Sequence, residues 1–341
     1  MSSNEIEWIK SRVDGLTDRS EEILDVDSEV RNEFNTWSAL KLIIHSATVN
    51  MYTMVAKEHF QDFFYIDALA GSGASDFDMT DQCFLGSPIV AARDAVEPFT
   101  KMYFIELDEA NNSALEDRLD YAFTNWDIDE PEGYEVIEGD ANEAIEYVKN
   151  DIWSTVRSKP YDPKFNSLLF ADNQGLDFYW SSLQSLNNSI TGDFLINYPA
   201  SQVGRNLSNR GSREAIADFF GRDMWDVYPK DWDHFSELYT EQIEEMDHPE
   251  TVVTKVKGKK SFYYDMIYAT RRTSGGSGYI DAIKHVKQFV EAVDGADVRE
   301  VLEVLNGNQS VIEDFWPEDN TINEDLIEDE DSNQKGLDEF W

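Results

Sequence analysis

Blocks of apolar and polar positions alternate along this chain and predict strands and helices in turn. Short, mostly apolar runs predict seven strands, at 62–67, 101–106, 134–138, 167–172, 193–198, 251–257 and 261–270. Segments with helical apolar spacing predict helices at 28–60, 88–96, 109–123, 142–157 and 279–305. Strands that alternate with helices are typical of a parallel, doubly wound sheet.

The last two predicted strands specify the fold class more closely. Lysines and a glycine at 257–260 separate the last two strand-like runs and predict a hairpin turn. Five parallel strands followed by a C-terminal antiparallel hairpin strand are typical of a class I methyltransferase, a Rossmann-like α/β fold with a seven-stranded, mostly parallel sheet. Residues 200–250 interrupt the list with helical, aromatic sequence, which we expect to form a helical insertion.

Composition divides the chain into three parts. Residues 1–27 are acidic and weakly amphipathic, which predicts a loose N-terminal arm containing a helix. Residues 28–310 carry the signals of the methyltransferase-like domain. Residues 317–341 hold ten acids and one lysine, which predicts a disordered acidic tail.

Acidity extends over the whole chain. The 341 residues carry 69 acids and 28 bases, a net charge of −41, of which −32 lies before residue 317. Self-repulsion of this size opposes compaction unless salt screens it, and at 1 M ionic strength the screening length is only about 3 Å. The composition favours a halophilic source over the alternative, an ordinary acidic mesophilic protein.

A thermal melt in rising KCl tests the halophilic interpretation. We expect the Tm to rise by roughly 5–10 °C or more between low and molar KCl, because relieved repulsion is worth a few kcal/mol in a domain of this size. A Tm that stays level or falls over that range would contradict the interpretation.

The cysteine count and the hydropathy pattern bear on the cellular location of the protein. Cys83 is the one cysteine, which excludes an internal disulfide and a thiolate metal cluster. The first residues lack the basic and apolar regions of a signal peptide, and no apolar run approaches the length of a membrane span. From both absences we expect a soluble, cytoplasmic protein. The five histidines do not have the spacing of metal ligands, so we predict no metal site.

The first predicted strand ends in Asp67 and runs at once into a loop of small residues, from Ala70 to Gly73. Such a break lets a ligand lie against bare backbone, although a plain tight turn looks the same. Asp76 stands at the third-glycine position of the dinucleotide pattern, which disfavours a nucleotide-binding oxidoreductase. An acid beside the loop suits a cationic ligand, and S-adenosylmethionine carries both a sulfonium and an ammonium.

Acids also end the next two strands. Glu106 follows the second strand, where a carboxylate accepts hydrogen bonds from ribose hydroxyls. Asp140 follows the third, where it can meet an adenine amino group. Either carboxylate could instead be solvated or, at Asp140, cap a helix. The predicted cofactor contacts are Asp67, Ala70, Gly71, Gly73, Glu106 and Asp140.

The fourth strand ends at Asp172, at the switch point where open sheets place catalysis. Asp172 and Asn173 are side chains that can orient a substrate amine, although asparagine and glycine here are also typical of a turn. Lys41 in the first long helix either extends its ammonium to solvent or reaches the site from below, and spacing alone favours the first. We take Asp172, Asn173 and Lys41 as the candidate catalytic residues.

Two acid-poor segments stand out in so acidic a chain. Residues 194–213 hold three arginines and no acid, and the lysine turn follows the sixth strand. Both are expected at the carboxyl-end face of the sheet, which favours an anionic substrate such as nucleic acid. Local balancing of nearby carboxylates explains the pattern equally well. The candidate substrate-binding residues are Arg205, Lys257 and Lys259.

Taken in order, these motifs resemble those of the three-Cys-motif partner proteins (TcmP), a family of methyltransferase-like proteins. The resemblance covers about residues 35–290. The matching stretches are Trp37 to Lys41, Tyr65 to Gly73, 86–88, 104–106, 170–175, and 197–199 with Arg205. It implies a class I methyltransferase fold, S-adenosylmethionine as cofactor held through Asp67, Gly71, Gly73 and Glu106, and a role for Asp172. It also implies a partner protein with three cysteines and, with the charge, a halophilic archaeal source.

One stretch departs from the family pattern. Residues 172–175 read Asp-Asn-Gln-Gly, where the family has Asp-Pro-Phe-Gly and enzymes that methylate nucleic-acid amines often carry Asp-Pro-Pro-Tyr. The proline and the stacking aromatic are both absent at 173–174. The sequence therefore predicts a methyltransferase acting on nucleic acid or a nucleic-acid-associated partner, with a catalytically inactive binding module of the same fold as the alternative.

Overall fold

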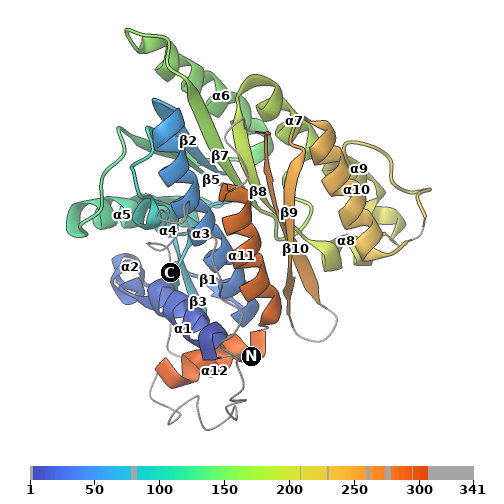
Figure 1. The fold of residues 1–341 in the computed structure, drawn as a ribbon, viewed down its shortest axis with the longest axis horizontal. Coiled ribbons are helices and arrows are strands. Elements are labelled where there is room, and N and C mark those ends of the chain that lie inside the picture. The colour runs from blue at the N-terminus through green and yellow to red at the C-terminus, as the bar shows by residue number, and fades with distance from the viewer. Residues whose placement is uncertain are drawn as a thin grey trace, which may run out of the picture.

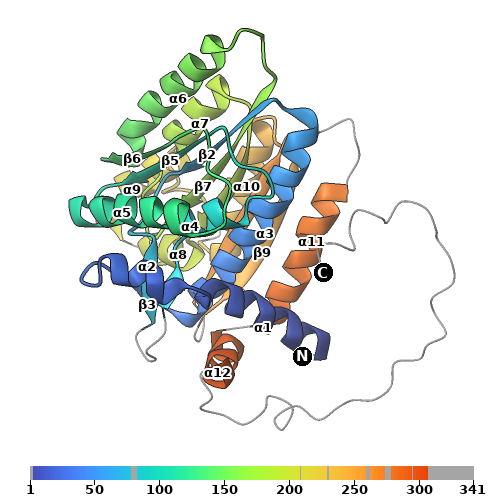
Figure 2. The ribbon, with the colours of Figure 1, turned by 90° about the vertical axis from the view of Figure 1, so that its left-hand side faces the viewer.

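The computed structural model describes residues 3–77, 83–207, 209–228, 230–258, 262–272, 278–293 and 295–305. One large sheet lies between two layers of helices (Figures 1 and 2). Within the described ranges, no helix combines the length and apolar character needed to cross a membrane. The predicted tail at 317–341 and the candidate residue Lys259 lie outside the described residues.

The large sheet has seven strands in the order β6-β5-β2-β7-β8-β10-β9. Their bounds are β2 Asp62–Asp67, β5 Lys101–Glu106, β6 Tyr134–Glu138, β7 Phe165–Asp172, β8 Gly192–Tyr198, β9 Glu250–Lys257 and β10 Tyr263–Thr270. β10 runs antiparallel to both β8 and β9, and every other neighbouring pair is parallel. An antiparallel strand inserted beside the fifth parallel strand distinguishes a class I methyltransferase sheet from a dinucleotide-binding one. The predicted fold class is confirmed.

Helices bury both faces of this sheet. One layer comprises α3 (Thr36–His59), α4 (Ser87–Asp94), α5 (Glu109–Asn125) and α11 (Gly278–Ala292); the other comprises α6 (Ala141–Ser158), α7 (Trp180–Ser189), α9 (Arg213–Phe220) and α10 (Trp232–Glu245). Alternate residues of β2 pack into opposite layers, with Tyr65 in the first and Phe64 and Ile66 in the second. Burial on both faces explains why the central strands read as continuous apolar runs.

The predicted helical insertion lies between β8 and β9. It comprises α8 (Ala200–Asn206), the short 3₁₀ helix Arg210–Ser212, α9 and α10. Phe219 and Tyr239 stack on one another with ring centroids 5.0 Å apart, and both pack against Tyr198 at the end of β8. Phe219 and Tyr239 therefore form part of the core.

The N-terminal segment is packed against the body of the protein. It forms α1 (Ser3–Thr17) and α2 (Ser20–Val26), and its buried residues Ile9, Val13 and Leu16 join the core beside α3. α12 (Gly295–Leu305) packs on the same side. Because these apolar positions recur at helical spacing, the helix buries a continuous stripe. The expectation of a loose arm is therefore wrong for the described residues.

A second, small sheet was not predicted. It has the order β1-β3-β4, with β1 Asn32–Phe34, β3 Ala74–Phe77 and β4 Cys83–Leu85. β1 takes residues that we expected to begin the first long helix, which starts at Thr36 instead. The predicted helix at 279–305 is also divided, into α11 and α12. β3 of the small sheet begins directly after the glycine loop, so this sheet lies next to the carboxyl end of β2.

Candidate functional site

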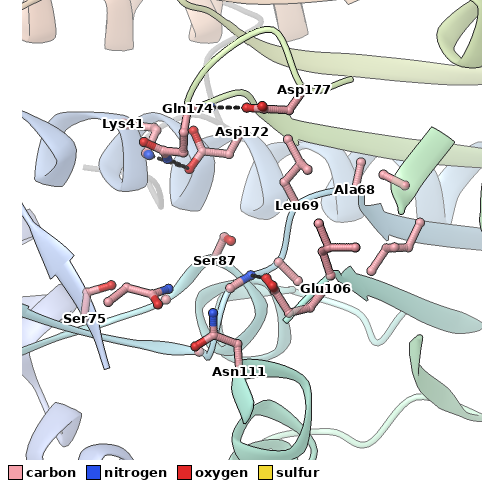
Figure 3. Close-up of a pocket in the computed structure, with 18 of the residues that line it drawn as sticks. Lys41, Ala68, Leu69, Ser75, Ser87, Glu106, Asn111, Asp172, Gln174 and Asp177 are labelled. Atoms are coloured by element: carbon pink, nitrogen blue, oxygen red, sulfur yellow. Dashed lines mark hydrogen bonds and ion pairs between the residues drawn. The ribbon is translucent and has the colours of Figure 1, made fainter. Parts of the chain in front are cut away.

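A cavity of about 590 Å³ lies at the carboxyl ends of the parallel strands. Its walls come from the segments that follow β2, β5, β6 and β7, and from the N-terminal residues between Asn32 and Leu42 (Figure 3). The crevice beyond the carboxyl ends of the strands is where open α/β sheets bind ligands. Seven predicted site residues line it: Lys41, Ala70, Gly71, Gly73, Glu106, Asp140 and Asp172.

The loop after β2 requires glycine at two positions. Gly71 and Gly73 have φ values of +65° and +79°, in the left-handed region. A Cβ atom on Gly71 would lie 2.6 Å from Asn32 Nδ2, and one on Gly73 would lie 2.9 Å from Leu115 Cδ1. The loop therefore presents bare backbone to the cavity, as the sequence predicts.

Glu106 lies opposite this loop, at the end of β5. Its Oε2 accepts a hydrogen bond from Gly71 N at 2.8 Å, and its Oε1 accepts one from Asp108 N at 2.8 Å. A carboxylate has about four acceptor positions, so it keeps capacity for a ligand diol. Asp140 also lines the cavity, while its Oδ1 caps α6 by accepting from Asn142 N at 2.7 Å. The capping role that the sequence allowed for Asp140 is present in the structure.

Asp67 lies beneath the loop and is not among the described residues that line the cavity. The side chain is fully buried, and Oδ2 accepts from the Tyr65 hydroxyl at 3.3 Å. That hydroxyl is also 2.7 Å from His45 Nε2. Burial raises the pKa of Asp67 to about 7 and lowers the pKa of His45 to about 3. The structure therefore places Asp67 as a support of the loop, where direct cofactor contact was expected.

Replacing Asp67 with asparagine should change how stability depends on pH. The folded-state pKa is raised from 3.8 to about 7, so the folded protein binds this proton more tightly than the unfolded chain. The stability linked to Asp67 is therefore present below pH 4 and is lost as pH rises toward 7. We expect the unfolding free energy of the wild type, relative to Asp67→Asn, to fall by up to about 4 kcal/mol over that range.

Urea melts between pH 4 and 7.5 measure this difference. Asp218→Asn makes the same substitution on the exposed side of α9 and is the matched control. A wild-type minus Asp67→Asn difference that stays flat with pH would contradict the buried position of Asp67.

Lys41 and Asp172 meet at one end of the cavity (Figure 3). Lys41 Nζ forms an ion pair with Asp172 Oδ2, and the two side chains are only 7% and 13% exposed. Gln174 Nε2 donates to the same oxygen at 3.1 Å. The interpretation that Lys41 extends to solvent is therefore wrong, and the lysine reaches the site from α3.

Asn173 does not face the cavity. Its side chain is 1% exposed, donates through Nδ2 to Asn197 O at 3.0 Å and accepts at Oδ1 from Phe178 N at 2.9 Å. These bonds hold the turn after β7, so a substrate contact from the Asn173 side chain is not supported. Asn197 in turn donates through Nδ2 to Asp172 Oδ1 at 2.9 Å and to Asn173 O at 3.0 Å. The sequence did not single out Asn197, although it lies in a stretch that carries the family resemblance.

Of the predicted substrate-binding residues, Arg205 and Lys257 are not among those that line the cavity. Arg205 on α8 donates to Gln202 Oε1, and Lys257 at the end of the edge strand β9 donates to the Glu291 carbonyl at 3.4 Å. Among the described residues that line the cavity, four carboxylates stand against the single ammonium of Lys41; they are those of Glu106, Asp140, Asp172 and Asp177. The described lining therefore does not contain the predicted basic rim, and its charge favours a cationic ligand. The described part of the chain also holds no cluster of metal-ligating side chains.

Several lining residues were missed by sequence reasoning. Asn32, Asn35 and Ser38 form the N-terminal wall, and Asn111 and Tyr179 contribute from α5 and from the segment after β7. The lining also includes four apolar residues, three of them next in sequence to Glu106 or Asp140: Ile105, Leu107, Ala141 and Leu176. The polar lining residues are isolated in the sequence and form no periodic pattern. Their common position becomes visible only in the folded chain.

A buried arginine joins the N-terminal wall to the glycine loop. Arg118 on α5 is fully buried and donates to four backbone carbonyl oxygens, those of Ile23 (3.0 Å), Ser72 (2.7 Å), Asp27 (2.6 Å) and Val30 (2.6 Å). Burial lowers the pKa of this guanidinium. One side chain therefore connects α2, the approach to β1 and the glycine loop.

No protein-family model and no curated protein matches the chain. Solved structures do show similarity. A Legionella pneumophila protein of the DUF519 family, LPL1258, is 10% identical with a TM-score of 0.45, over 74% of this chain and 92% of that one. Trm1 from Pyrococcus horikoshii, solved with S-adenosylmethionine, is 11% identical with a TM-score of 0.39, over 79% and 59%. The plantazolicin methyltransferase BpumL, solved with S-adenosylhomocysteine, is 10% identical with a TM-score of 0.34, over 79% and 98%.

Proposed function

We propose that the cavity binds S-adenosylmethionine and that the protein is a methyltransferase of the three-Cys-motif partner type. The observation that carries this proposal is the meeting of the glycine loop, Glu106 and Asp172 at the carboxyl ends of a class I methyltransferase sheet. The cradle suits the cofactor, because Gly71 and Gly73 line the cavity with backbone and no side chain. The excess of carboxylates in the lining suits a ligand with two cationic groups.

Each wall has a separate role in this proposal. Glu106 holds the ribose hydroxyls, the apolar end beside Leu107 and Tyr179 holds the adenine, and the backbone of 70–73 lies along the remainder. When bound, the cofactor supplies an electrophilic methyl group. The protein then positions the acceptor near the Lys41–Asp172 pair and excludes water.

The acceptor is a nucleic acid or a nucleic-acid-associated partner, and the partner carries the three-cysteine motif. These finer statements rest on the sequence resemblance and on the acid-poor segment around Arg205. The same resemblance and the charge of −41 support a halophilic archaeal source and a cytoplasmic location.

Transfer of labelled methyl groups from S-adenosylmethionine to total RNA, DNA and protein, in molar KCl, tests this function. We expect wild-type protein to label one of these fractions. Asp172→Ala should retain cofactor binding and lose about 100-fold in transfer, because a misplaced acceptor costs that much. Transfer that is unaffected by Asp172→Ala would place the chemistry elsewhere.

The second candidate is a binding module that holds the cofactor without turnover. The engagement of Asp172 by Lys41, Gln174 and Asn197 favours it, since this carboxylate is already largely satisfied. Cofactor binding with no labelled product in any fraction would support this candidate over the enzyme.

A further inference from the structure

At the Asp172 end of the cavity, a side-chain amide of the protein already donates to the Asp172 carboxylate. Asn197 Nδ2 donates both to Asp172 Oδ1 (2.9 Å) and to the carbonyl oxygen of Asn173 (3.0 Å). A side-chain carboxylate and the following carbonyl are a pair of acceptors suited to the two hydrogens of a substrate amine. The opposite orientation of the Asn197 amide would set its oxygen against two other oxygens. Asn173 and Asn197 are buried and are not among the described lining residues, so this NH₂ group satisfies Asp172 Oδ1 from behind the cavity wall.

The second oxygen of Asp172 is also engaged. Oδ2 takes the Lys41 ammonium and Gln174 Nε2, so three donors share a carboxylate with about four acceptor positions. Asn173 supplies no free group, because its side chain is turned inward. Lys41 has three N–H donors and directs one of them to Asp172. Lys41 therefore keeps two further N–H donors at this end of the cavity.

We infer that the subsite beside Lys41 recognises a base edge made only of hydrogen-bond acceptors, the N7 and O6 edge of guanine, and that N7 is the methyl acceptor. The inference rests on the proposed function, since it names the acceptor group for the same site. Guanine presents two acceptors on this edge, whereas adenine and cytosine present amino donors. Lys41 donates to O6 and leaves the N7 lone pair free.

The chemistry agrees with the charges of the cavity. The N7 lone pair forms the new bond to the methyl carbon, the carbon–sulfur bond breaks with its electrons remaining on sulfur, and no proton leaves. Positive charge passes from the sulfonium to the base, still within walls that hold four carboxylates. An amine would instead need a proton acceptor, and Asp172 is already paired with Lys41.

Binding of free nucleosides gives a readout that does not depend on turnover. Saturation-transfer NMR of the protein saturated with S-adenosylhomocysteine should detect guanosine more strongly than adenosine or cytidine. Lys41→Met should weaken guanosine binding roughly 10- to 100-fold, as expected for loss of a charged hydrogen bond, and Lys41→Arg should restore much of it. Lys57→Met, on an exposed turn of the same helix, is the matched control. Equal binding of the three nucleosides would overturn the inference.

Product identity gives the second readout. RNA and DNA methylated by the wild type, digested and separated as nucleosides, should contain 7-methylguanosine or its deoxy form. Asn197→Ala leaves Asp172 Oδ1 free to accept from a substrate amine and should raise the share of exocyclic-amine products at least about tenfold. Asn197→Ser is the second variant if the alanine protein does not fold.

The outcomes separate the two proposals. Wild-type methylation of an exocyclic amine, or of protein alone, would overturn the acceptor assignment and leave the cofactor site standing. An unchanged product in a folded Asn197 variant would overturn the role given to that residue. Failure of the wild type to bind S-adenosylhomocysteine would remove the proposed function and the inference together.

Discussion

Replacing Glu106 with alanine is expected to weaken S-adenosylmethionine binding by about 30-fold or more. The carboxylate is the polar group at the end of β5 that faces the cavity opposite the glycine loop, and it also holds Gly71 N at 2.8 Å. Loss of charged hydrogen bonds to the ribose is worth about 2 kcal/mol, which corresponds to that factor. Calorimetric titration in molar KCl measures the change in Kd.

Glu109→Ala is the matched control for this variant. Glu109 lies three residues further along, exposed in the first turn of α5, and its removal changes the net charge by the same amount. We expect its Kd to remain within about twofold of the wild type, because surface substitutions away from the site have little effect. Similar losses in the two variants would indicate a general charge effect rather than a ribose contact.

Replacing Arg118 with methionine is expected to produce the largest loss of stability. Four carbonyl oxygens, two of them in buried and two in partly buried bonds, lose their donor at once, and each unsatisfied buried group costs about 1–3 kcal/mol before local relaxation. We expect a decrease in Tm of about 10 °C or more, since each kcal/mol shifts the Tm of a domain this size by 2–4 °C. Because Ser72 belongs to the loop, cofactor binding should weaken as well.

Arg213→Met provides the control for this experiment. Arg213 is about half exposed and pairs with Asp223 on the surface, so its loss should leave the Tm nearly unchanged. Limited proteolysis adds a local readout, with new cleavage expected between residues 23 and 31 in the Arg118 variant. An Arg118 variant as stable and as protease-resistant as the wild type would contradict the connecting role of this side chain.

The large sheet was predictable because its signals are local. Each strand is an apolar run with a clear break, and the structure places all seven within two residues of the predicted bounds. The small sheet was not predictable, since β1 and β4 have three residues each and no room for a periodic pattern. The N-terminal arm was predicted to be loose because its apolar stripe is short, and the sequence of residues 1–27 does not identify α3 and α12 as the helices that bury this stripe.

The site was predictable only in part, for the same reason. Strand-end acids and the glycine loop are visible in sequence, and Glu106, Asp140 and Asp172 do lie around one cavity. Whether a strand-end acid faces the ligand or the core depends on packing, and Asp67 faces the core. The contact of Lys41 with Asp172 joins residues 131 positions apart, which no periodicity encodes.

Titration of the wild-type protein with S-adenosylmethionine, S-adenosylhomocysteine and NAD by calorimetry in molar KCl is the most direct test of the central claim, that this cavity is a methyltransferase cofactor site. We expect saturable one-to-one binding of the first two ligands and none of NAD, because Asp76 stands where a dinucleotide loop requires its third glycine. Absence of binding by both S-adenosyl ligands to the folded protein would contradict the claim.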